Sequence, residues 1–225
     1  MALRKHIPNS ITMLNLFTGS IAVYYAFNGN FTVSFFAILI AGLFDFLDGL
    51  AARVLKAYSP MGKELDSLAD VISFGLAPGV IVFSLLEQSA YPDWLKFAGF
   101  IIPVFSALRL AKFNIDENQT TSFIGLPTPA NAIFWAGMGY SFSGWLIENP
   151  WLAIALTIVL SGLLVSKLPM FSLKFKSLKW VQNRMQYIFL AGCALLLIVF
   201  GWKAFALIIG WYIFSSAILN PLMKL

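Results

Sequence analysis

The sequence has few charged residues, one cysteine and one histidine, and these shortages exclude several classes of protein. Only 11% of the 225 residues are charged and 60% are hydrophobic, whereas soluble domains have roughly 25% charged residues. The single cysteine, Cys193, lies in an apolar run and cannot form a disulfide within the chain. The single histidine, His6, stands beside two cations and is expected to be a solvated flank. The composition is therefore that of a membrane protein without a Cys/His metal site.

Eight apolar stretches are interpreted as membrane-spanning helices, because most are long enough to cross roughly 30 Å of hydrocarbon. They cover residues 9–28, 31–56, 63–86, 94–113, 128–146, 151–167, 186–201 and 204–220. We expect no cleavable signal peptide, since the first stretch contains Asn9, Thr12 and Asn15 and has no clear small-residue cleavage site. The sequence predicts one all-α membrane domain over residues 1–225, folded as a polytopic helical bundle.

The net charge of +5 is interpreted as a topology signal and not as a nucleic-acid-binding surface. If both termini and the connections 56–63, 113–128 and 167–185 are cytoplasmic, all of the 15 Lys and Arg residues except Lys96 and Lys203 lie on the cytoplasmic side. Residues 171–184 alternate cations with Phe, Leu and Trp. This segment is either an interfacial stretch that faces anionic lipid headgroups or a solvated loop that only determines topology.

Four aspartates lie at or inside the ends of two apolar stretches, where a buried charge is expensive. They are Asp45, Asp48, Asp66 and Asp70. At about 100° per residue, the first two share one arc of a helix with Gly49 and Ala52, and Arg53 lies at the edge of that arc. One helix face therefore carries two acids, two residues without bulk and a cation.

The second pair of aspartates follows a turn at Ser59 and Pro60, which interrupt the helical pattern. After the turn, polar and small residues recur every three or four positions along one stripe of the next helix. This stripe consists of Gly62, Asp66, Asp70, Ser73 and Ala77. A helical hairpin results, and its two acidic faces can converge.

Four carboxylates that face each other in a low dielectric repel unless they are protonated or neutralised. Hard divalent cations with oxygen ligands neutralise them most simply, so the pattern predicts one or two magnesium ions. Two such ions can clamp a pyrophosphate and orient an in-line attack. Arg53 suits phosphate oxygens, and Gly49 and Ala52 leave room for a flat nucleotide.

The stretch resembles the CDP-alcohol phosphotransferase signature D-x2-D-G-x2-A-R-x8-G-x3-D-x3-D at every fixed position. The matching residues are Asp45, Asp48, Gly49, Ala52, Arg53, Gly62, Asp66 and Asp70. The resemblance implies that Asp45, Asp48 and Asp66 bind one metal, and that Asp45, Asp66 and Asp70 bind a second. It also implies that Asp70 is the general base, and that the nucleotide and its phosphates contact Gly49, Ala52, Arg53 and Gly62.

In this family, six spans surround a polar chamber that opens to the cytoplasm, and residues 7–167 resemble that core. Residues 168–225 are then an added basic cytoplasmic loop and two further spans. Because these spans lack an intramembrane carboxylate, they are interpreted as scaffold or as the surface of a homodimer.

Further segments resemble the bacterial phosphatidylserine synthases of this family. They are residues 7–19 (IPNSITMLNLFTG), 70–78 (DVISFGLAP), 108–114 (LRLAKFN) and 123–132 (FIGLPTPANA). The resemblance implies transfer of the phosphatidyl group of CDP-diacylglycerol to L-serine with release of CMP, two Mg²⁺ or Mn²⁺ ions, and a cytoplasmic-side site in the inner membrane. Glycerol phosphate and inositol phosphate remain alternative acceptors.

Several polar residues outside the signature have two interpretations each. Asn9 and Thr12 are expected to face the nucleotide, although plain hydrogen bonding between helices is the alternative. Arg109 either snorkels to the interface or holds the carboxylate of an amino-acid acceptor. Lys112 is assigned to a phosphate or headgroup, and Ser73 either contacts the acceptor or bonds to its own helix.

Two other functions compete with phosphatidyl transfer. A membrane prenyltransferase would also bind a pyrophosphate through magnesium, but residues 71–225 contain no second paired acidic cluster within a span. A transporter would need its ionisable pathway to continue across the bilayer, whereas all four aspartates lie near one face. Both functions are therefore remote alternatives.

Overall fold

A computed structural model describes residues 2–115, 123–171, 180 and 183–219. The described chain is almost entirely helical, and its two strands, β1 (Phe123–Ile124) and β2 (Pro169–Met170), form one short antiparallel pair. This confirms the predicted all-α class. The two strands were not predicted, because two-residue segments carry no periodic signal.

The first three long helices form an up-down-up arrangement. They are α1 (Ala2–Phe27), α2 (Phe31–Val54) and a continuous helix made of α3 (Pro60–Asp70), the π-helical η1 (Val71–Leu76) and α4 (Ala77–Glu87). Asn30 caps α2 by accepting a hydrogen bond from the Val33 N–H, and Ser59 caps α3 by accepting one from the Gly62 N–H. Pro60 stands at the first position of α3, where a missing N–H costs nothing.

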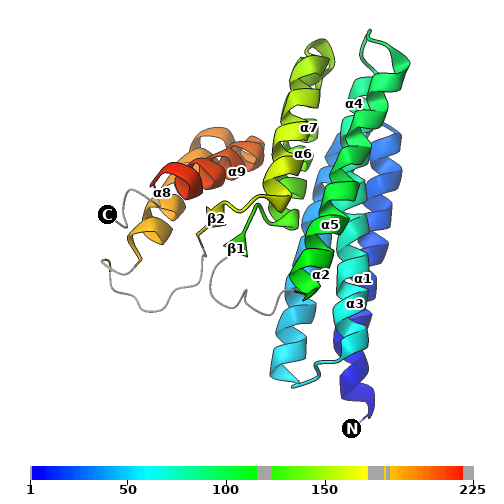
Figure 1. The fold of residues 1–225 in the computed structure, drawn as a ribbon, viewed down its shortest axis with the longest axis vertical. Coiled ribbons are helices and arrows are strands. Elements are labelled where there is room, and N and C mark those ends of the chain that lie inside the picture. Colours follow the sequence, from blue (N-terminus) through cyan, green and yellow to red (C-terminus); the bar gives the residue numbers. More distant parts are fainter. Residues whose placement is uncertain (1, 116–122, 172–179, 181–182, 220–225) are drawn as a thin grey trace.

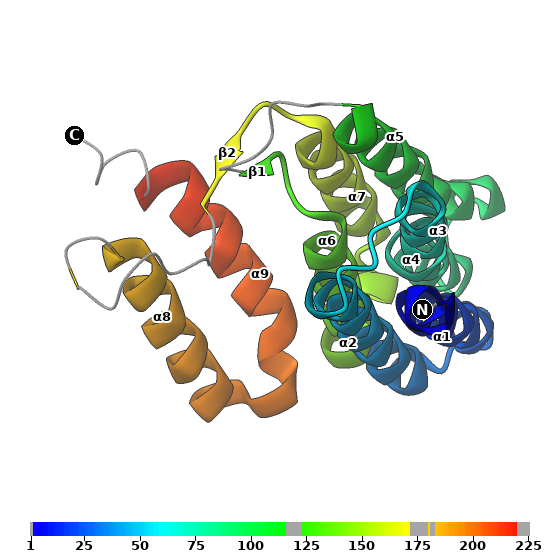
Figure 2. The ribbon, with the colours of Figure 1, turned by 90° about the horizontal axis from the view of Figure 1, so that it is seen from below.

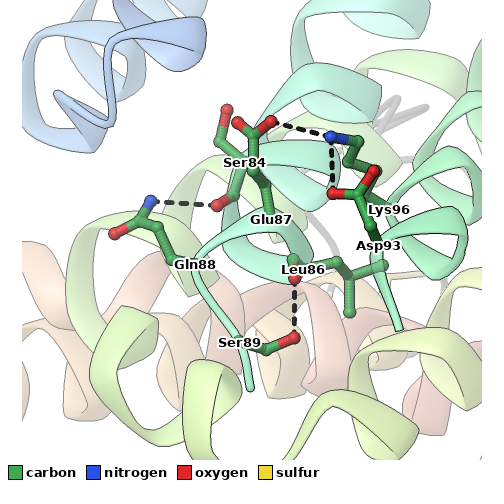
Figure 3. Close-up of polar contacts among 7 residues, drawn as sticks. All are labelled: Ser84, Leu86, Glu87, Gln88, Ser89, Asp93 and Lys96. Carbon is green, nitrogen blue, oxygen red and sulfur yellow. Dashed lines mark hydrogen bonds and ion pairs between the residues drawn. The ribbon is translucent and has the colours of Figure 1, made fainter. Parts of the chain in front are cut away.

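The next helices complete the bundle. They are the 3₁₀-helix η2 (Asp93–Phe100), α5 (Ile101–Ile115), α6 (Thr128–Glu148) and α7 (Pro150–Val165). Figure 1 shows α1 to α7 side by side along the long axis, with the N-terminus and the α2–α3 turn at one end. At the opposite end, between α4 and η2, Lys96 pairs with Glu87 at 3.0 Å and with Asp93 at 2.8 Å (Figure 3). Successive helices of the bundle therefore alternate in direction, which agrees with the alternating sides assigned to their connections.

The continuous helix Pro60–Glu87 runs through the centre of the bundle. In the most apolar 18-residue segment of this helix, 78% of the residues are buried. In the corresponding segments of α1 and α2, about one-third of the residues or fewer are buried. Phe74, Ile81 and Leu85 of this helix are fully buried. A side chain at Gly79 would collide with the Gly99 carbonyl oxygen, so the absence of a Cβ lets α4 and η2 pack closely. The helix that carries Asp66 and Asp70 is thus the central element of the fold.

Five helical stretches are long and apolar enough to cross a membrane. They are His6–Phe27, Phe31–Val54, Pro60–Glu87, Asp93–Ile115 and Arg184–Leu219, and α7 is a shorter apolar helix. Eight spans were predicted: the one at 128–146 is not among these five, and those at 186–201 and 204–220 fall within the single stretch Arg184–Leu219. The protein is therefore a multi-pass membrane protein. The observed helix ends lie close to the predicted ones except in α1, which begins at Ala2 and contains Pro8.

The last two predicted helices form a hairpin. It consists of α8 (Arg184–Phe200), the 3₁₀ turn η4 (Gly201–Lys203), α9 (Ala204–Phe214) and the π-helical η5 (Ser215–Leu219). Gly201 has a φ of 56°, which a residue without a Cβ adopts readily. Figure 2 looks along the bundle and shows α8 and α9 lengthwise, so the hairpin lies across the bundle axis. Helix periodicity predicted both helices but not this angle.

The hairpin packs on the bundle through α9. A side chain at Gly137 of α6 would collide with the Ala206 backbone, and the rings of Phe35 and Phe205 are 5.3 Å apart. The basic segment 171–184, interpreted as either a lipid-facing stretch or a solvated loop, lies mostly outside the described residues, which include only 171, 180, 183 and 184 of it.

Candidate active site

Three of the four predicted aspartates converge. Ligand oxygens of Asp45 and Asp48 on α2 and of Asp66 on α3 all lie within 4.8 Å of one another. We call these residues the acidic triad. The two acidic faces meet because the turn between Val54 and Pro60 folds α2 and α3 into the predicted hairpin. The convergence that the sequence predicted is therefore present.

The acidic triad has the properties of a divalent-cation site. The buried oxygens Oδ2 of Asp48 and Oδ1 of Asp66 have no hydrogen-bond partner. Within the described ranges, the only ion pairs are those of Lys96 at the other end of the bundle. Buried carboxylates without a compensating charge are unfavourable, and carboxylate oxygens are the ligands that Mg²⁺ and Mn²⁺ prefer. The donor set therefore fits a divalent metal.

Asp70 lies near the acidic triad but apart from it. Its side chain is buried and accepts a hydrogen bond from Asn15 Nδ2 at 3.4 Å, and it stands one helical turn after Asp66 of the triad. Two residues four positions apart on a helix differ by about 40° in direction around the helix axis. Asp70 is therefore turned away from Asp66, towards α1. The structure therefore places three acids together and the fourth beside them.

Ser73 links α1 to the π-helical segment. It is fully buried, and its hydroxyl donates to the Asn15 carbonyl at 3.1 Å. Its neighbour on α1 is Gly19, where a Cβ would collide with the hydroxyl. A bond of Ser73 to its own helix, one of the two interpretations of this residue, is therefore wrong: Ser73 lies in the π-helical segment, which departs from an α-helical register.

A cavity of about 620 Å³ opens beside the acidic triad, between α1, α2 and α3. We call it the main cavity. Its lining includes acids of the triad, small residues of the signature and polar residues of α1. The complete lining is Pro8, Asn9, Thr12, Asp48, Gly49, Ala52, Ala57, Tyr58, Ser59, Pro60, Gly62, Lys63 and Asp66. The Thr12 hydroxyl donates to the Pro8 carbonyl of its own helix at 3.1 Å.

Arg109 and Lys112 lie together at a second, small cavity of about 60 Å³. Arg109 is only 8% exposed, and its Nε donates to the Leu126 carbonyl at 2.5 Å. Snorkelling of Arg109 to the interface is therefore wrong. The guanidinium is held inside the protein, where the chain enters α6.

A family profile described as CDP-alcohol phosphatidyltransferase matches residues 5–218. The chain belongs to this family. CDP-diacylglycerol–serine O-phosphatidyltransferases are among its relatives. The one from Mycobacterium leprae is 34% identical over 175 residues, which cover 73% of this chain and 57% of the relative. The one from Bacillus subtilis is 34% identical over 168 residues, which cover 73% of this chain and 89% of the relative.

A third relative, from Helicobacter pylori strain 26695, has the same name and is 36% identical over 128 residues. These residues cover 56% of this chain and 54% of the relative. The chain therefore spans little more than half the length of the Mycobacterium leprae and Helicobacter pylori relatives, but most of the Bacillus subtilis one.

The signature of this phosphatidyltransferase family divides into two groups in the structure. Asp48, Gly49, Ala52, Gly62 and Asp66 line the main cavity. Asp45 completes the acidic triad, Asp70 lies beside it, and Arg53 is exposed and does not line the cavity. Arg53 is the residue that the helical wheel had placed at the edge of the acidic face.

Sequence reasoning missed part of the cavity wall. Pro8 and the connection from Ala57 to Pro60 contribute to it, as does Lys63 on the first turn of α3. The only sequence signal was position: these residues stand beside Asn9 or between fixed positions of the signature. Lys63 was interpreted only as a topology charge.

Proposed function

We propose that this protein transfers the phosphatidyl group of CDP-diacylglycerol to the hydroxyl of L-serine, giving phosphatidylserine and CMP. The observation that carries the proposal is the acidic triad at the wall of a cavity of about 620 Å³. The names of the relatives support the donor and the acceptor. The proposed location is the cytoplasmic membrane, with the main cavity facing the cytoplasm, which agrees with the charge bias of the connections.

The nucleotide of the donor is proposed to bind in the main cavity. Gly49 and Ala52 lack bulky side chains and offer a flat wall on α2. Asn9 and Thr12 face the same space from α1 and can hydrogen-bond the base or the ribose. Open walls with a few convergent polar groups are typical of small-molecule sites.

The acidic triad is proposed to hold one divalent ion, and Asp45, Asp66 and Asp70 a second, with Mg²⁺ or Mn²⁺ as the metal. Such ions supply charge neutralisation at the diphosphate and at the leaving phosphate. Asp48 Oδ2 and Asp66 Oδ1 are free to serve as ligands because no protein donor bonds them. The chain itself contributes the fixed geometry, since the carboxylates project from α2 and α3, which both pack on α1.

Asp70 is proposed to be the general base. Its carboxylate takes the proton of the serine hydroxyl while the hydroxyl oxygen bonds to the phosphorus attached to diacylglycerol. The bond from that phosphorus to the CMP oxygen breaks, and CMP leaves. The Asn15 amide orients one Asp70 oxygen, which leaves the other for the incoming alcohol. A positioned base of this kind contributes about 10²–10⁴-fold to the rate.

The acceptor is proposed to be recognised by the cations of the small cavity. Arg109 can bind the serine carboxylate with its terminal N–H groups while Nε stays on the Leu126 carbonyl. Lys112 lines the same cavity. Ser73 is retained only as a positioning residue, because its hydroxyl is engaged by the Asn15 carbonyl.

The domain organisation is also proposed. Residues 7–167 form the catalytic core, and residues 168–225 add a basic loop and the α8–α9 hairpin. The exposed apolar side chains of that hairpin, among them Leu195, Ile198 and Val199, are available to lipid or to a second copy of the chain in a homodimer.

An acceptor panel tests the function. Purified protein with CDP-diacylglycerol and Mg²⁺ should release CMP when L-serine is added, and not with glycerol phosphate or inositol phosphate. Excess EDTA should stop the reaction. If CMP is released only with another acceptor, the protein is still a phosphatidyltransferase but serine is not its acceptor. If no acceptor releases CMP, the proposed function is wrong.

A further inference from the structure

Lys63 is the only cationic side chain among the described residues that line the main cavity. It stands on the first turn of α3, directly after the signature residue Gly62. Lys63 and Arg53 are both exposed, but Arg53, which the sequence assigned to phosphate, does not line the cavity. Among the described lining residues, Lys63 is therefore the cation that a diphosphate in this cavity would meet.

The Lys63 ammonium is held in place without being neutralised. Its Nζ donates to the Asn114 carbonyl at 2.7 Å, at the C-terminal end of α5. A lysine has three N–H donors, so two remain for a ligand. No ion pair forms between Lys63 and a described carboxylate. The charge is therefore available at the cavity.

The end of α5 is itself anchored, which makes the lysine position well defined. The Asn114 side chain donates to Ser67 Oγ at 2.8 Å, and Ser67 bonds back to the Lys63 carbonyl at 3.2 Å. Lys63, Ser67 and Asn114 thus form a closed hydrogen-bonded link between α3 and α5. An ordered lysine loses less rotamer freedom on binding an anion than a free surface lysine does.

The N-terminus of α3 adds a second attraction for an anion at the same place. Ser59, Pro60 and Gly62 all line the main cavity, and the first turn of a helix carries partial positive charge. Lys63 and this helix end both belong to the part of the lining that α3 contributes.

We infer that Lys63 binds a phosphate oxygen of the nucleotide diphosphate, with the Asn114 carbonyl positioning its ammonium. This inference rests on the proposed function, because it requires a nucleotide diphosphate in the main cavity. The competing role is structural: Lys63 would only satisfy the last carbonyls of α5.

Binding of CDP to purified protein in Mg²⁺, measured by titration calorimetry, tests the inference. Lys63→Met should weaken CDP binding by about tenfold or more, since a charge-assisted hydrogen bond contributes about 1.5–3 kcal/mol. Binding of cytidine, which lacks phosphate, should be unchanged when measured by competition. Lys63→Gln keeps a donor for the Asn114 carbonyl but not the charge, and should show the same loss. Lys63→Arg should retain most of the affinity.

Lys56→Met is the matched control, because Lys56 lies in the same α2–α3 connection, is exposed and does not line the cavity. Its affinity for CDP should equal that of the wild type. If the wild type does not bind CDP, the proposed function itself fails. If the wild type binds and both neutral Lys63 variants bind equally well, only the inference is overturned. Equal loss of CDP and cytidine binding, or loss in Lys63→Met without loss in Lys63→Gln, would assign Lys63 the structural role.

Discussion

The two ends of the bundle carry acidic side chains in opposite settings. At the α4–η2 end, Glu87 and Asp93 are exposed, and both pair with Lys96 (Figure 3). At the end near the α2–α3 turn, the acidic triad has no described cation in ion-pair contact, and two of its buried oxygens lack any partner. Carboxylates are thus paired with a cation at one end of the bundle and have no cation partner among the described residues at the other.

This difference indicates that Glu87 and Asp93 have a structural role, whereas the acidic triad has a functional one. Exposed ion pairs contribute little to stability, so the pairing of Lys96 is a local feature of the connection. Unpaired buried carboxylates destabilise the fold, and a protein retains them where they bind something. The following predictions test this contrast, beginning with the largest expected effect.

Replacing Asp66 by Asn should abolish turnover. We expect a loss of more than about 10⁴-fold, because a ligand shared by both proposed metals supports several kcal/mol of transition-state stabilisation. The melting temperature in EDTA should rise, since the substitution removes one of several repelling charges. CMP release and thermal unfolding on one preparation measure both effects. Full turnover by the variant would remove the two-metal assignment.

Replacing Asp70 by Asn should lower kcat by about 10²–10⁴-fold while CDP-diacylglycerol binding largely survives. The reason is that Asp70 lies outside the acidic triad and does not line the main cavity. Nucleotide-lipid affinity and turnover should be measured side by side. Proportional loss of both would make Asp70 mainly a metal ligand, and the base would have to be another group.

Replacing Arg109 by Lys should raise the KM for serine by about tenfold and change the KM for CDP-diacylglycerol much less. Lysine keeps the charge but lacks both the planar fork and the Nε donor to Leu126. The expected size is that of one charge-assisted hydrogen bond. Initial rates over a serine series measure it, and an unchanged serine KM would limit Arg109 to holding the entry into α6.

Replacing Glu87 by Gln should have the smallest effect. The ion pair with Lys96 is exposed, and Asp93 remains as a partner, so activity should be unchanged and the melting temperature should shift by less than about 3 °C. The same assays apply. A loss of turnover comparable to that of the Asp66 variant would break the contrast between the two ends.

The sequence alone predicted the helices and the acidic hairpin well. Long apolar runs must become helices in a membrane, because every backbone polar group needs a partner inside the segment. The four aspartates stood out for the same reason, since a bilayer makes charge expensive. Ser59 and Pro60 placed the turn that brings Asp45 and Asp48 back against Asp66.

Only the tertiary structure decided which side chains meet. The helical stripe grouped Asp66, Asp70 and Ser73, but in the structure Asp70 bonds to the Asn15 side chain of α1, and Ser73 in the π-helical η1 bonds to the Asn15 carbonyl. A hydrogen bond to the Asn114 carbonyl of α5 holds Lys63 at the cavity, while Arg53 stays outside its lining. Periodicity within one helix specifies the face of a residue, whereas the rotation of neighbouring helices about their axes depends on side chains distant in sequence.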